Sequence, residues 1–139
     1  MSEGAFVIPS GLDTITEDKP VEPGIRRVVI RNWKPRMSKD GTREMVEVGL
    51  AIEDADDAPM FSEFLSKPKR GDEPRTVRMM LQNLKRFVTA FGIEAGEGEE
   101  ITGDTAVGKS ANVPVDVEEF ERKDGTKGRR NTLKLPRFE

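Results

Sequence analysis

Hydrophobic residues alternate with polar or small ones in several segments of this chain, which is the period of a β-strand with one buried face. The clearest example is the segment EMVEVGLAIED (44–54), whose inward face is predicted to consist of Val46, Val48, Leu50 and Ile52. The segment IRRVVIRNW (25–33) precedes it, and the Asp40-Gly41 pair between the two segments is a strong turn signal. The pattern predicts a long hairpin.

A second hairpin is predicted near the end of the sequence, where ANVPVDVEEFE (111–121) and RNTLKLPRF (130–138) flank the turn RKDGTKGR. Its inward residues are predicted to be Val113, Val115, Val117, Leu133 and Leu135. Pro114 has no amide proton, so its strand is expected at an edge or with a bulge. The tetrapeptide KDGT occurs in both turns and indicates the same turn chemistry twice. A further short strand is predicted at about 60–66, with a helical turn as the alternative.

Residues 70–93 have the period of an amphipathic α-helix. Its inward face is predicted to consist of Val77, Met80, Leu81, Leu84, Phe87, Val88 and Phe91. Asp72 is expected to cap the start, Pro74 is tolerated in the first turn, and Gly92 suits the end. The opposite face carries a polar row, interpreted as solvated, with phosphate contact as the alternative: Arg78, Gln82, Lys85 and Thr89.

The element order is strand, strand, short strand, helix, strand, strand. This predicts a mostly β fold, a five-stranded OB-fold-like barrel with one α-helix between the third and fourth strands. Four phenylalanines are assigned to its core: Phe61, Phe64, Phe87 and Phe91. Residues 1–24, rich in Pro, Gly and acids, are expected to be a flexible acidic arm, and residues 25–139 the domain. Residues 94–106 are expected to be a mobile acidic loop within it.

The chain has no cysteine and no histidine. Disulfides, thiolate nucleophiles, Ser-His triads and the usual zinc ligand sets are therefore excluded, and neither a metal nor a cofactor is expected. No apolar run approaches the roughly 20 residues of a membrane span. The expected location is the cytoplasm, that of the host cell if a phage encodes the protein, without contact with a membrane.

The formal net charge of −3 conceals separate charge blocks. Residues 25–43 carry seven Arg or Lys against a single acid, and residues 122–137 form a second basic block. Acidic blocks occupy 44–60 and 94–104. The two basic segments would form one positive surface if the fold brought them together, whereas the alternative is that each block is a solvated face.

Trp33 is the sole tryptophan and lies within the first basic block. If the alternation is unbroken, its side chain points away from the core beside Arg27 and Arg31. Cations and a flat ring on one strand face suit a single strand of nucleic acid, and the alternative is a hydrophobic lid over a barrel end. Phe120 is a further stacking candidate, with a core position as the alternative. The predicted nucleic-acid-binding residues are Arg27, Arg31, Trp33, Lys34, Arg36, Lys39, Arg43, Lys127, Arg129, Arg130, Lys134, Arg137 and Phe138.

Three segments, RMMLQNLKRFVTAFGI, GDTAVGKSANVPVDVEEFERKDG and GRRNTLKLPRF, resemble a family of small phage and prophage proteins described as single-stranded DNA-binding, with an OB-type fold. The resemblance covers about residues 25–138. The matching motif positions are Phe87, Ala90, Phe91, Gly92, Val107, Gly108, Lys109, Arg130 and Asn131. It implies a role in phage DNA replication, recombination or repair, with phage or host proteins of those processes as partners. The sequence ends KLPRFE, without the acidic partner-recruiting tail of well-known single-strand binders.

The sequence thus predicts a protein that binds single-stranded DNA largely without sequence specificity and catalyses no reaction. RNA is an open alternative, because it offers the same phosphates and base faces. A protein-interaction or phage structural module is a second alternative. A metal-dependent nuclease is the weakest, with candidate carboxylates at Asp54, Asp56, Asp57, Asp116 and Glu118. Site size and oligomeric state, a homodimer among them, stay open.

Overall fold

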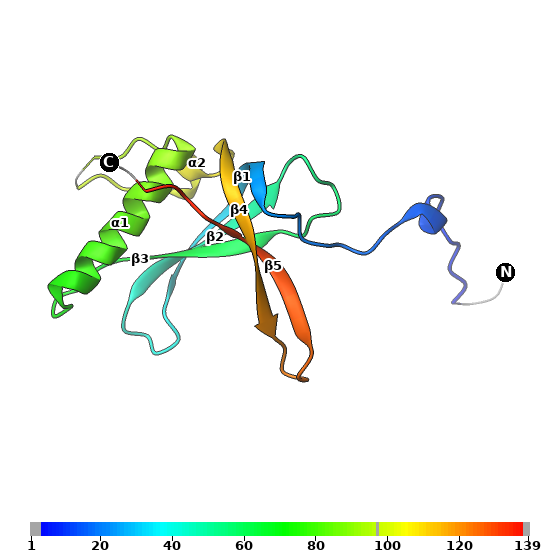
Figure 1. Cartoon of the computed structure of the whole chain (residues 1–139), viewed down its shortest axis with the longest axis horizontal. Coiled ribbons are helices and arrows are strands. Elements are labelled where there is room, and N and C mark those ends of the chain that lie inside the picture. The colour runs from blue at the N-terminus through cyan, green and yellow to red at the C-terminus, as the bar shows by residue number, and fades with distance from the viewer. Residues whose placement is uncertain (1–3, 97, 138–139) are drawn as a thin grey trace.

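The structure is a computed structural model that describes residues 4–96 and 98–137. Its five strands are β1 (Gly24–Met37), β2 (Glu44–Ile52), β3 (Phe61–Ser66), β4 (Ser110–Glu121) and β5 (Lys127–Leu133). They form one antiparallel sheet in the order β3-β2-β1-β4-β5 (Figure 1). The helices are η1 (Leu12–Thr14), α1 (Pro74–Phe91) and α2 (Gly103–Ala106). The predicted mostly β fold, with its long helix between the third and fourth strands, is confirmed.

The sheet is not closed into a barrel, which is where the predicted fold and the structure differ. Its two edge strands approach each other, but among the described residues no ladder joins β3 to β5. Instead, the backbone N–H of Leu133 donates a hydrogen bond of 2.8 Å to the Glu63 carboxylate. A side chain therefore bridges the two edges where a closed barrel would have backbone pairing.

One face of the sheet packs against α1 and forms the core. The alternation predicted for the strands is confirmed at its centre by five buried residues: Val48, Leu50, Ile52, Val113 and Val115. From α1, Phe87 and Phe91 pack with 4.8 Å between their ring centroids. Two core assignments are wrong, because the side chains of Leu81 and Phe64 are each 51% exposed.

A β-bulge interrupts β1 and changes which side chains face the core. Ile30 pairs with Leu50, but Asn32 pairs with the adjacent Gly49, so Arg31 is an extra residue. The loop before β4 bonds the other edge of β1 at this point, because Ile30 donates to the Lys109 carbonyl and accepts from the Gly108 N–H. The alternation consequently shifts by one residue after Ile30.

The start of α1 differs from the prediction. The residue before the helix is Glu73, and its side chain makes no capping hydrogen bond. Asp72 does not cap the helix, because its carboxylate accepts hydrogen bonds from Arg43 and from the Lys69 N–H. Pro74 in the first turn and Gly92 directly after the last residue are as predicted.

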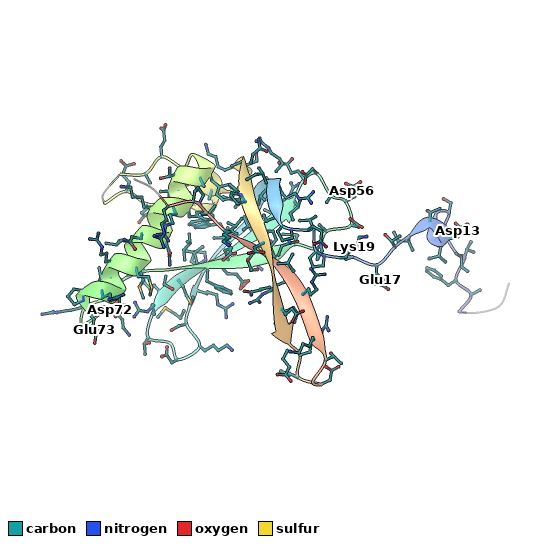
Figure 2. All side chains as sticks on the ribbon, viewed as in Figure 1. Asp13, Glu17, Lys19, Asp56, Asp72 and Glu73 are labelled. Carbon is teal, nitrogen blue, oxygen red and sulfur yellow. The ribbon has the colours of Figure 1, made fainter. Side chains whose placement is uncertain are left out.

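The N-terminal segment joins the domain at residues 19–21. Lys19 N–H donates to the Asp57 carbonyl in the β2–β3 loop, and Val21 is buried in the core. Figure 2 shows Lys19 near Asp56 of the same loop. The buried Asn131 side chain bonds both the N–H and the carbonyl of Val21, at 3.0 and 2.9 Å. Residues 4–18 extend away from the domain (Figure 1). The fold therefore begins inside the segment 1–24 that was expected to be an arm.

Part of the predicted acidic loop is ordered as α2. Thr102 and Thr105 form a reciprocal capping box at its start, and Ala106 is fully buried. Within the described ranges, none of the helices is long and apolar enough to span a membrane.

Candidate nucleic-acid interface

The side of the sheet opposite to the core, called here the outer face, carries an exposed aromatic ring among cations. After the bulge, Lys34 pairs with Glu47, and Glu47 pairs with Phe64, so these three residues form a row across β1, β2 and β3. Arg36 lies in the next row. Its guanidinium is 6.0 Å from the centre of the Phe64 ring and 2.7 Å from a Glu47 oxygen. A half-exposed ring with a guanidinium over it is a surface on which a base can stack.

Gly49 has no side chain that would project from this part of the outer face. It pairs with Asn32, and a Cβ at position 49 would lie 2.9 Å from the Asn32 side-chain nitrogen. The glycine therefore makes room for the side chain of Asn32, which occupies the space where a Cβ at position 49 would project. The amide adds a hydrogen-bond donor and acceptor beside Lys34.

A second exposed ring lies on the β4–β5 hairpin, where the alternation of β4 places Phe120 on the side opposite to the buried Val113 and Val115, that is, on the outer face. It belongs to what is called here the Phe120 cluster, which consists of Phe120, Arg122, Gly128 and Arg130. The guanidinium carbons of Arg122 and Arg130 lie 5.5 and 5.6 Å from the centre of the Phe120 ring. Arg122 also donates to the Lys127 carbonyl at 2.7 Å, which holds its guanidinium in place. The ring thus has two guanidinium groups beside it.

Gly128 explains how Phe120 lies on the hairpin. The two residues are paired across the strands, and a Cβ at position 128 would come within 2.5 Å of the tip of the ring. The ring therefore lies over bare backbone and presents its other side to solvent. Any side chain at position 128 would lift it.

Both hairpins end in the same turn chemistry. In each KDGT turn the aspartate, Asp40 or Asp124, accepts hydrogen bonds from the N–H and the hydroxyl of the threonine two residues later. A hydrogen bond from the Ser38 hydroxyl, together with those from Thr42, lowers the pKa of Asp40 to about 2, and the bonds from Thr126 lower the pKa of Asp124. The repeated motif is thus repeated turn chemistry, as predicted. In Figure 1 the two turns point to the same side of the molecule.

Several of the predicted cations already have acidic partners. The pairs are Arg27 with Glu53, Arg36 with Glu47, Arg129 with Glu22, Arg130 with Glu118, and Lys134 with Asp116. These pairs are partly or largely exposed, and such pairs contribute little stability. A phosphate group could therefore replace the carboxylates at modest cost, and fewer of these cations than their number suggests are available to a phosphate without first losing a partner.

The remaining predicted residues differ in their surroundings. In the described part of the chain, no ion pair is found for the exposed side chains of Arg31, Lys34, Lys39, Lys127 and Arg137. Arg43, in contrast, makes two hydrogen bonds of 2.8 Å to Asp72, and both side chains are largely buried. Its guanidinium is therefore engaged within the fold. Phe138 lies outside the described residues.

Trp33 does not share a face with Arg27. Because of the bulge it pairs with the buried Val48 on the core side, where its ring lies 6.4 Å from that of Phe87. The exposed part of the Trp33 side chain lines a groove of about 740 Å³ between the β1–β2 hairpin, α1 and residues 99–101. The prediction that the indole points away from the core is wrong, and the lid interpretation describes its position.

The acidic residues considered for a nuclease are dispersed. Asp54, Asp56 and Asp57 lie in the β2–β3 loop, whereas Asp116 and Glu118 lie on β4 near basic partners. In the ranges that the structure describes, no three acidic side chains converge to hold a metal ion.

Sequence reasoning missed Phe64 and Arg122 as site residues. Strict alternation along FSEFLS places Phe61 and Leu65 on one face of the strand and Phe64 on the other face. Similarly, the KDGT turn sets a register in which Phe120 faces Gly128. Both signals were present in the sequence.

No family model matches the chain, and no curated protein matches its sequence. The resemblance to phage single-stranded DNA-binding proteins therefore stays a prediction.

Proposed function

We propose that this chain binds single-stranded DNA, largely without sequence specificity, through the outer face of its sheet, and that it has no catalytic activity. The observation that carries the proposal is the pair of exposed rings: Phe64, with the guanidinium of Arg36 over it, and Phe120, with two guanidinium groups beside it. Unpaired bases stack on such rings with about 1–3 kcal/mol each, and cations beside them bind the phosphates.

We also infer an OB-type fold that is left partly open between β3 and β5. OB-folds bind oligonucleotides on the face of their second and third strands and on the loops that follow strands one and four. Phe64 occupies the corresponding strand face, and the two KDGT turns occupy the corresponding loops. Action in replication, recombination or repair, with the partners that the resemblance implies, belongs to the same proposal.

The test is fluorescence anisotropy of a labelled oligo-dT titrated with the full chain. A labelled strand is preferable to intrinsic fluorescence, because Trp33 lies on the other side of the sheet. We expect saturable binding that weakens as salt rises, and a single strand should compete better than duplex of equal length. Labelled oligo-rU tests the preference between DNA and RNA. Absence of binding at low salt would contradict the proposal and favour a protein-interaction module.

A further inference from the structure

Several apolar side chains of the N-terminal arm, residues 4–18, are exposed to solvent and are not part of the core of the domain. Phe6, Val7 and Ile15 are 85%, 87% and 75% exposed, and Ile8 and Leu12 are more than half exposed. The hydrogen bonds that the structure shows for this arm are internal, between Gly11 or Leu12 and the residues that follow. The arm also carries three acids: Asp13, Glu17 and Asp18.

Helix α1 presents the complementary chemistry. Its 18 residues include four basic residues and no acidic one. Arg75 and Arg78 are exposed in its first turns, where the helix dipole disfavours cations. Two exposed apolar side chains, Met79 and Leu81, flank them.

The surface of α1 is also hollowed on both sides of Arg78. One depression, of about 580 Å³, is lined by Asp72, Val77, Leu81 and Lys85, among others. The other, of about 650 Å³, is lined by Glu73, Arg75, Thr76 and Met79. Arg78 and Gln82 line both. These residues form the α1 outer surface, which combines cations with apolar depressions.

We propose that the arm of one copy docks on the α1 outer surface of a second copy, with its apolar side chains in the depressions and its acids beside Arg75 and Arg78. The arm leaves the domain beside the β2–β3 loop, whereas α1 begins at the other end of the molecule. Figure 2 shows this separation, with Asp13 and Glu17 at one end and Asp72 and Glu73 at the other. The contact therefore forms between copies.

The interface is heterologous, because the arm lies at one end of the molecule and the surface that binds it lies at the other end. Such contacts join copies head to tail, in a ring if the rotation closes and in an open row if it does not. A row of this kind would place neighbouring copies along one strand and make their binding cooperative, which is common among single-strand binders. The assembly itself does not depend on nucleic acid.

The test is sedimentation velocity of the full chain without nucleic acid, at low salt and rising protein concentration. We expect the average sedimentation coefficient to rise with concentration. Arg75→Glu with Arg78→Glu should weaken association about tenfold or more, because it places acids against acids. Asp13→Lys with Glu17→Lys should do the same, and combining all four changes should restore association. Lys67→Glu with Lys109→Glu changes the charge equally elsewhere and should associate like the natural chain.

A natural chain that stays monomeric at every concentration would overturn the proposal, as would a folded helix variant that associates normally. Circular dichroism establishes that the helix variant is folded. Phe6→Ser with Ile8→Ser supplies a change that cannot unfold the domain, because those side chains are outside it, and normal association of that variant would also overturn the proposal. Binding of oligo-dT by a monomer would support the proposed function while refuting this inference, and association without DNA binding would do the reverse.

Discussion

Trp33 packs against Phe87, with 6.4 Å between the ring centroids and 42° between the ring planes. The contact exists because the bulge at Arg31 turns the indole to the core side of the sheet. Trp33 is therefore part of the packing between the β1–β2 hairpin and α1, and its neighbours Asn32 and Lys34 point to the outer face.

Trp33→Ala is expected to lower the free energy of unfolding by about 3 kcal/mol, because truncation of a packed aromatic side chain leaves a cavity. Urea denaturation measures this loss. The affinity of the folded variant for oligo-dT should be unchanged, because the indole lies on the opposite side of the sheet from Phe64. Trp33→Phe should cost less stability, because it keeps a ring against Phe87. A variant of natural stability with weakened binding would instead place Trp33 in the nucleic-acid site.

The strands could be predicted from the sequence because alternation follows from one buried face. Val48 and Leu50 on β2, and Val113 and Val115 on β4, are buried as the pattern requires. The bulge in β1 could not be predicted in the same way, because Ile30 there accepts a hydrogen bond from the Gly108 N–H and donates one to the Lys109 carbonyl, and both residues are distant in sequence. The bulge at this long-range contact changes the side of the sheet to which every later residue of β1 points.

The charged residues of the candidate site also could not be assigned from the sequence alone, because their partners are distant in sequence. A block of basic residues in the sequence indicates cations, but it does not say which of them have partners. Arg43 belongs to the first basic block, yet it is held by Asp72 from the start of α1. Conversely, the ring of Phe64 is available because α1 covers the other side of the sheet.

Asp72→Asn is expected to lower the melting temperature at neutral pH by several degrees, because it removes the charged partner of Arg43. The Arg43 guanidinium holds the pKa of Asp72 well below its usual range. A lowered pKa contributes stability above the unfolded-state value of about 3.9 and loses it as the pH falls through the folded-state value. The difference between natural and variant melting temperatures should therefore narrow below about pH 4.

The matched control is Asp56→Asn in the β2–β3 loop, which changes the same group at an exposed position and should leave the melting temperature unchanged. Arg43→Lys should behave like Asp72→Asn at neutral pH, because lysine cannot make the two parallel bonds. Equal melting temperatures of the natural chain and both variants at pH 7 would show that the pair does not hold the hairpin to α1.

Glu63→Gln is expected to leave stability at neutral pH unchanged or higher. Burial raises the pKa of Glu63, and the nearby Glu118 adds to the shift, whereas the N–H of Leu133 opposes it. The charged form is therefore disfavoured in the folded state, and glutamine keeps an oxygen for the Leu133 bond. The natural chain should gain stability relative to the variant as the pH falls through the raised pKa toward the ordinary value. Melting temperatures of both proteins from neutral to acidic pH measure this, and a constant difference would contradict it.

The last prediction concerns the two rings proposed to bind bases. Phe64→Ala and Phe120→Ala should each weaken binding of oligo-dT by about 1–3 kcal/mol, because each removes one stacking surface. Stability should change little, since both side chains are partly exposed, and Val107→Ala is the control because it truncates another exposed apolar side chain outside the outer face. Gly128→Ala should reproduce part of the Phe120→Ala defect, because its methyl group would displace the ring. Anisotropy titrations measure all four variants. If the folded Phe64→Ala and Phe120→Ala proteins bind oligo-dT with the affinity of the natural chain, bases do not stack on the outer face. Any binding by that face would then come from its cations alone.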